Sequence, residues 1–68
     1  MYQFEELYAA ASKYDSTTEE RMALYNWLDH YDSGSWNGEC FDLGDGHSLY
    51  PIYEEHDGDF DVIDAEIR

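Results

Sequence analysis

The sequence predicts an α+β fold in which two N-terminal helices pack on a small three-stranded antiparallel sheet. Two observations support this prediction. Apolar residues recur every three or four positions up to about residue 32, and beyond it short β-type runs alternate with turn dipeptides. A chain of 68 residues has room for one small domain, in which only about 60% of the unfolded surface becomes buried. We therefore expect residues 1–68 to form a single domain.

The first helix is expected over residues 3–14 and the second over residues 17–32. On the first helix, the side chains that share one face are Phe4, Leu7, Tyr8, Ala11 and Tyr14. The second begins with capping-box spacing, either Ser16 with Glu19 or Thr17 with Glu20, and Gly34 is expected to stop it. Its apolar stripe comprises Met22, Leu24, Tyr25, Trp27, Leu28 and Tyr31.

Three β-strands are expected within residues 39–67, in the runs 39–43, 48–54 and 60–67. The turn dipeptides around them are Asn37-Gly38, Asp45-Gly46 and Asp57-Gly58. Alternation in the last run places Ile63, Ala65 and Ile67 on one face. Because Pro51 cannot donate to a sheet ladder, the middle run should be an edge strand, contain a bulge, or be shorter than drawn.

Aromatic and aliphatic side chains supply the expected core, which comprises Phe4, Leu7, Trp27, Leu28, Phe41 and Ile63, with Cys40 as a small buried side chain. Seven tyrosines exceed what so small a core can hold with every hydroxyl bonded. Some of them should reach the surface, the candidates being Tyr2, Tyr8, Tyr14, Tyr31, Tyr50 and Tyr53. Exposed tyrosines fit a binding face, and partial burial with a hydrated hydroxyl explains them equally well.

Negative charge dominates the composition. Seventeen acidic residues oppose three basic ones, which gives a formal net charge of -14. This charge excludes ordinary nucleic-acid binding and disfavours anionic membranes. The 18% aromatic content argues against disorder. With no signal peptide, no run of about 20 apolar residues and a lone cysteine, the expected location is the cytoplasm, that of the host cell if a phage encodes the chain.

No motif indicates catalysis or a metal site. An EF-hand loop that starts at Asp57 would have Val62 at the glycine position and Arg68 at the glutamate position. Four residues of types that bind zinc lie too far apart in sequence to form a close ligand pair: His30, Cys40, His47 and His56. Nucleophilic catalysis would require Cys40 or a serine with a histidine base held in a pocket, and Cys40 is expected to be buried as a small apolar side chain. We expect a protein that is not an enzyme and that has no cofactor and no dedicated metal site.

The acidic residues are concentrated in the second half of the chain. Residues 39–68 contain ten acids and one base, and the stretch HDGDFDVIDAEIR closes the sequence. A net charge of 2 to 8 is about what solubility requires, and a larger excess opposes folding. The excess therefore favours a surface that binds a basic partner, with a solvated face as the alternative. The residues expected on that surface are Asp42, Asp45, Tyr50, Tyr53, Glu54, Glu55, Asp57, Asp59, Asp61, Asp64 and Glu66.

Such a surface can imitate a nucleic acid if neighbouring segments combine their charges. Alternate side chains on a strand lie about 6.6 Å apart, whereas one DNA strand carries a charge per about 3.4 Å. In size, acidity, aromatic content and runs such as YEEHDGDFDVIDAE, the chain resembles the small acidic DNA-mimic inhibitors of phages and mobile elements, of anti-CRISPR or anti-restriction type. This resemblance is compositional and involves no signature motif.

The resemblance implies a non-enzymatic inhibitor, monomeric or homodimeric, that occupies the basic nucleic-acid-binding channel of a host defence nuclease. It implies no direct binding to nucleic acid or membrane. The composition leaves a second reading open, in which the chain is a general acidic interaction module such as an antitoxin, an immunity protein or an accessory subunit.

Overall fold

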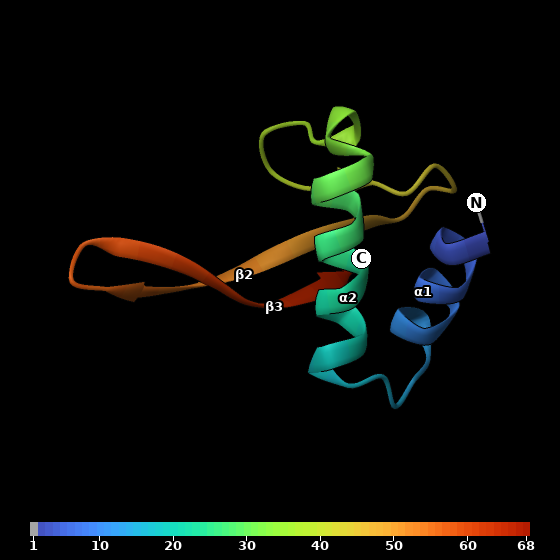
Figure 1. The fold of residues 1–68 in the computed structure, drawn as a ribbon, viewed down its shortest axis with the longest axis horizontal. Coiled ribbons are helices and arrows are strands. Elements are labelled where there is room, and N and C mark those ends of the chain that lie inside the picture. The colour runs from blue at the N-terminus through green and yellow to red at the C-terminus, as the bar shows by residue number, and fades with distance from the viewer. Residues whose placement is uncertain (1) are drawn as a thin grey trace.

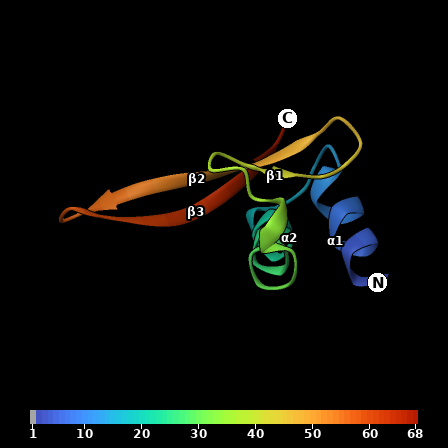
Figure 2. The ribbon, with the colours of Figure 1, turned by 90° about the horizontal axis from the view of Figure 1, so that it is seen from above.

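The computed structural model describes residues 2–68 and confirms the α+β fold. The elements are α1 (Tyr2–Ser12), α2 (Thr18–Tyr31), a short 3-10 helix η1 (Ser33–Ser35), β1 (Phe41–Asp42), β2 (Ser48–His56) and β3 (Asp59–Ile67). The strands form one antiparallel sheet in the order β1-β2-β3. Both helices lie on the same side of this sheet, with α2 beneath its inner part and α1 beyond α2 (Figures 1 and 2). No helix within residues 2–68 is long and apolar enough to cross a membrane.

Helix α2 begins with the predicted capping box, and the pair that forms it is Thr17 with Glu20. The Thr17 hydroxyl accepts a hydrogen bond from the Glu20 backbone N–H at 3.2 Å, and the Glu20 carboxylate accepts one from the Thr17 N–H at 2.9 Å. These two bonds satisfy N–H groups that a helix start otherwise leaves unpaired. The helix ends at Tyr31, before the expected stop at Gly34, which instead lies within η1.

Helix α1 ends at Ser12, two residues before its predicted end. Tyr14 therefore follows the helix and does not share its apolar face, contrary to the prediction. Its exposed fraction of 107% agrees with its place among the tyrosines expected at the surface. The turn after Ser12 takes the chain away from the core before another helical turn can form. A hydrogen bond from the Ser16 N–H to the Lys13 carbonyl, 3.1 Å long, closes this turn.

The core lies between α2 and the inner part of the sheet. Leu24, Leu28 and Leu49 are fully buried, and α1 contributes Ala11. Phe41 and Cys40 are buried as predicted, whereas Phe4, Leu7 and Trp27 are partly buried around them. Tyr31, which was predicted to lie on the apolar stripe of the second helix, is exposed at the end of α2.

Pro51 is accommodated because β1 is short. Ser48 and Arg68 exchange two backbone hydrogen bonds of 2.9 and 2.8 Å, so Pro51, three residues further along, faces Ala65 at a position without ladder hydrogen bonds. On its other side β2 pairs with β1 only at Ser48 and Leu49. The missing N–H of Pro51 therefore leaves no partner unsatisfied, although β2 is central in strand order.

A bulge in β3 overturns the expectation that Ile63 belongs to the core. Ile52 pairs with Asp64 and the next residue, Tyr53, pairs with Val62, so Ile63 has no partner. An extra residue of this kind shifts the alternation of the strand. Ile63 is accordingly 45% exposed, while Ala65 and Ile67 keep their places against the core.

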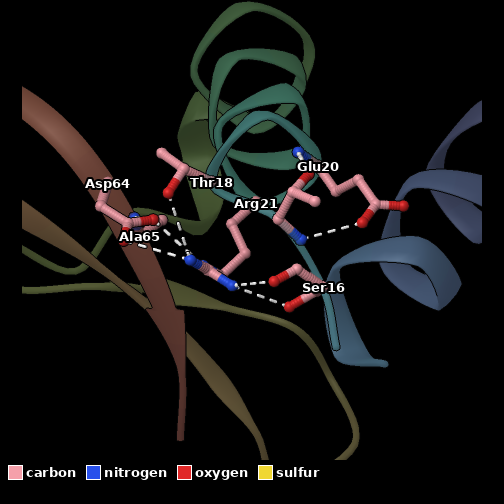
Figure 3. A network of polar contacts seen from close by, with 7 residues as sticks. Ser16, Thr18, Glu20, Arg21, Asp64 and Ala65 are labelled. Carbon is pink, nitrogen blue, oxygen red and sulfur yellow. Dashed lines mark hydrogen bonds and ion pairs between the residues drawn. The ribbon is translucent and has the colours of Figure 1, made fainter. Parts of the chain in front are cut away.

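Arg21 ties α2 to β3 (Figure 3). Its Nε and Nη2 atoms donate to the two carboxylate oxygens of Asp64, at 3.0 and 3.2 Å. Its Nη1 donates to the carbonyl and the hydroxyl of Ser16, at 2.7 and 2.9 Å. Asp64 also accepts a hydrogen bond from the Ala65 backbone N–H at 2.7 Å. Because the pair is bidentate and partly buried, it fixes the position of β3 under the helix.

Candidate functional site

The most exposed part of the sheet is the far half of the β2–β3 hairpin, residues 53–62, which we name the acidic hairpin. It extends away from both helices along the longest dimension of the molecule (Figures 1 and 2). Every residue from Tyr53 to Asp61 is exposed, and only Val62 is half-buried. The molecule therefore presents this segment to solvent on both faces.

A tight two-residue turn closes the acidic hairpin. Asp57 and Gly58 both have positive φ, 49° and 87°, and the flanking residues His56 and Asp59 are paired. Positive φ at both central positions is the requirement of a type I′ turn, which matches the natural twist of two strands. The predicted turn dipeptide Asp57-Gly58 thus fixes the register of the strands on either side.

That register gives the acidic hairpin two chemically different faces. Glu54 lies opposite Asp61, and His56 lies opposite Asp59, so one face is acidic. On the other face Tyr53 lies opposite Val62, and Glu55 opposite Phe60. The rings of Tyr53 and Phe60 meet edge to face, with centroids 6.5 Å apart. This aromatic face continues the surface on which Leu49 is buried nearer the helices.

The cations of the chain lie elsewhere. Lys13 pairs with Glu20 at 3.2 Å, Arg21 with Asp64, and Arg68 with Glu66 at 3.2 Å. These are all three lysine and arginine residues of the sequence. Within the acidic hairpin, the ion pair that the structure contains joins His56 to Glu54, and it carries charge only when the histidine is protonated. The carboxylates of this segment therefore have no permanent counter-charge.

The structure separates the predicted binding residues into three groups. The acidic hairpin contains Tyr53, Glu54, Glu55, Asp57, Asp59 and Asp61. At its base lie Tyr50, Asp64 and Glu66, which already have partners: Asp64 and Glu66 pair with arginines, and the Arg68 guanidinium lies 4.5 Å from the Tyr50 ring centre. Asp42 and Asp45 lie at the opposite end of the sheet, on β1 and the loop after it.

The predicted site carboxylates outside the acidic hairpin make hydrogen bonds or ion pairs within the chain. Asp42 accepts a hydrogen bond from the Gly44 N–H at 2.9 Å, and Asp45 accepts one from the Tyr8 hydroxyl at 2.7 Å. Burial and then this bond to Asp45 raise the pKa of Tyr8 to about 12. The same bond lowers the pKa of Asp45, and the hydrogen bonds from Arg21 lower the pKa of Asp64. Asp45 and Asp64 are thus stabilised as anions by groups of the chain itself.

Sequence reasoning missed an aromatic pocket beside the acidic hairpin. The pocket has a volume of about 160 Å³ and is lined by Tyr25, Asp29, Ser33, Trp36, Phe41 and Tyr53. Its residues come from α2, η1, β1 and β2, with Trp36 directly after η1, so only the tertiary structure brings them together. In the sequence, the pocket was indicated only by the four-residue spacing of Tyr25 and Asp29, which places both side chains on one face of a helix.

Within residues 2–68 no group of three or more His, Cys, Asp or Glu side chains is arranged to hold a metal ion.

No family model, no curated protein and no solved structure matches the chain significantly.

Proposed function

We propose that this protein is a non-enzymatic acidic inhibitor that binds the basic nucleic-acid-binding groove of a protein complex, with a host defence nuclease as the expected target. One observation carries the proposal. Glu54 and Asp61 lie directly opposite each other on a projecting hairpin that contains no lysine or arginine. Like charges in this position oppose strand pairing. A cationic group of a partner would relieve that repulsion. Contact with such a group would therefore favour both binding and the pairing of the two strands.

The charge spacing of the acidic hairpin supports nucleic-acid mimicry. Its five carboxylates are Glu54, Glu55, Asp57, Asp59 and Asp61. Four to five residues of strand span about 15 Å, which gives about one charge per 3 Å of hairpin when its two faces are counted together. Duplex DNA carries one charge per about 1.7 Å and a single strand one per about 3.4 Å. Two paired strands thus reach the density of a single nucleic-acid strand, which one strand alone does not.

The second candidate is a general acidic interaction module, and the aromatic face favours it. Tyr53 and Phe60 are 52% and 66% exposed, and exposed aromatic rings are typical of protein interfaces. Both candidates require a basic protein partner. They differ in whether nucleic acid and this chain compete for one site on that partner.

The test is to capture binding proteins from a lysate and to compare what the wild type and a hairpin variant retain. The tagged chain is incubated with host-cell lysate at low salt, and bound proteins are eluted with short duplex DNA or RNA and identified. We expect a nucleic-acid-binding protein that nucleic acid displaces. The triple variant Asp57→Asn, Asp59→Asn, Asp61→Asn should bind this protein at least about tenfold more weakly, since each desolvated contact is worth about 1 kcal/mol or more.

The matched control is Glu6→Gln, Asp15→Asn, Glu39→Gln, which removes the same number of charges from exposed sites outside the hairpin. This variant should keep most of the affinity. Equal binding by both triple variants, together with failure of nucleic acid to compete, would overturn the proposal. Loss of binding by the hairpin variant without competition would indicate the interaction module.

A further inference from the structure

The aromatic pocket beside the acidic hairpin has the composition of a cation-binding site. Phe41 is buried and forms its floor, with the rings of Trp36 and Tyr25 at 4.9 and 5.7 Å between centroids. Tyr53 of β2 adds a further wall. Cations are attracted to the faces of such rings, and a site with several rings binds them more strongly than one ring does.

A carboxylate and a helix end add negative potential to this pocket. Asp29 lies in the last turn of α2, and its side chain makes no hydrogen bond or ion pair within the part of the chain that the structure describes. The C-terminal end of a helix carries partial negative charge on its free carbonyl groups. Burial raises the pKa of the neighbouring Tyr25, and the charge of Asp29 adds to this effect, which places the carboxylate beside the rings.

We propose that this pocket binds the guanidinium group of an arginine side chain from a basic partner protein. Its volume of about 160 Å³ is that of about five water molecules, which suits one side-chain head group and is below the size of ordinary small-molecule sites. A planar guanidinium stacks on aromatic rings and bonds a carboxylate at the same time, which an ammonium group does less well. An apolar side chain could not form an ion pair with the Asp29 carboxylate, which lines the pocket.

The chain contains an internal example of this recognition. The Arg68 guanidinium lies 4.5 Å from the centre of the Tyr50 ring and pairs with Glu66 at 3.2 Å. No arginine or lysine of the chain lines the aromatic pocket, since all three pair elsewhere. The proposal rests on the proposed function only for the existence of a basic partner.

The binding step can be tested without that partner. The ¹⁵N-labelled protein is titrated with N-acetyl-arginine amide, and with N-acetyl-citrulline amide as a neutral probe of similar shape. We expect the Trp36 indole N–H signal to shift and saturate with arginine, while the Trp27 indole, which does not line the pocket, serves as a reference. The citrulline probe should bind at least about tenfold more weakly, because it lacks the charge on which cation–π attraction depends.

Variants locate the site. Asp29→Asn should weaken arginine binding about two- to fivefold, the range of an exposed ion pair, and Tyr53→Ser should weaken it by a similar factor. Both residues are exposed, so the amide spectrum should otherwise remain that of the folded protein. Asp15→Asn, an exposed acid far from the pocket in the sequence, is the charge-matched control and should leave binding unchanged.

Two results would overturn the proposal: shifts confined to the acidic hairpin with the Trp36 indole unmoved, or equal binding of citrulline and arginine. Either result leaves the proposed function intact if the hairpin variant still loses its partner. Conversely, saturable arginine binding at Trp36 without any nucleic-acid-competed partner would support the pocket and contradict the proposed function.

Discussion

The acidic hairpin and the rest of the molecule, which we name the body, differ in whether their charged side chains form ion pairs with lysine or arginine. The body contains all three lysine and arginine residues, and each one pairs with a carboxylate. It also contains the fully buried leucines. The acidic hairpin has five carboxylates, no lysine or arginine and no buried side chain. The other twelve acids of the sequence lie in the body, so the acidic hairpin carries five negative charges in ten residues and the body a net of nine in fifty-eight. The charge per residue is therefore highest where few tertiary contacts depend on it.

This difference indicates how so acidic a chain can fold. An isolated two-stranded hairpin is only marginally stable in water. Here its strands continue into the body, where Arg21 and the core hold them, and the type I′ turn with the Tyr53–Phe60 contact supports the far end. The body supplies the stability, and the acidic hairpin carries the charge that we assign to binding. Changes in one region should leave the other largely unaffected.

The strongest test compares apolar side chains of the two regions. Leu28→Ala should lower the free energy of unfolding by about 2–5 kcal/mol, because Leu28 is fully buried in the body. Phe60→Ala should cost under about 1 kcal/mol, because the ring is mostly exposed. Urea unfolding followed by circular dichroism measures both. Similar losses would show that the acidic hairpin is part of the core's cooperative unit.

Two aspartates of β3 provide a second comparison with identical chemistry. Asp64→Asn should destabilise the protein by about 1–2 kcal/mol, because Arg21 would lose its charged partner. Asp61→Asn, three residues earlier on the same strand, should be neutral or slightly stabilising, because Asp61 faces Glu54. The measurement is again urea unfolding. A loss at Asp61 as large as that at Asp64 would contradict the division into body and acidic hairpin.

Local sequence signals predicted the elements well, because their causes are local. The Thr17–Glu20 capping box, the Asp57-Gly58 turn and the apolar spacing of Leu24 and Leu28 each act within a few residues. The two-helix, three-strand order followed from them. The end of α1 was less predictable, since Tyr14 continued the apolar spacing but the chain turned before it.

Features that depend on tertiary contacts were not predictable. The bulge that exposes Ile63 arises from strand register, and the short β1 that accommodates Pro51 depends on a loop. The list of acidic site residues could not separate Asp64, which the distant Arg21 neutralises, from Asp61, which has no such partner. The aromatic pocket forms only where four elements meet. The sequence therefore indicated it only through the spacing of Tyr25 and Asp29 on one helix.

Acid should destabilise the body through Asp64. Its pKa in the folded protein is lowered by Arg21, so its contribution to stability is complete above the unfolded-state value near pH 4 and is lost as the pH falls through the folded value. Thermal melting between pH 6 and pH 2.5 should show this loss as a falling melting temperature. The Asp64→Asn variant should lack that part of the decline, whereas Asp61→Asn should follow the wild type. Parallel declines in all three proteins would contradict the assignment.

The smallest expected effect concerns salt and the acidic hairpin. The screening length is about 30 Å at 0.01 M salt and about 10 Å at 0.1 M, so added salt weakens repulsion between carboxylates on neighbouring strands. We expect sodium chloride to raise the melting temperature of the wild type. The triple variant Asp57→Asn, Asp59→Asn, Asp61→Asn should start a few tenths of a kcal/mol more stable and respond less, because Glu54 then faces an amide. Asn at position 57 also tolerates the positive φ of the turn.

The Glu6→Gln, Asp15→Asn, Glu39→Gln control removes equal charge elsewhere. If it responds to salt as weakly as the hairpin variant does, the repulsion is spread over the whole surface, and no special role of the acidic hairpin in the charge balance remains.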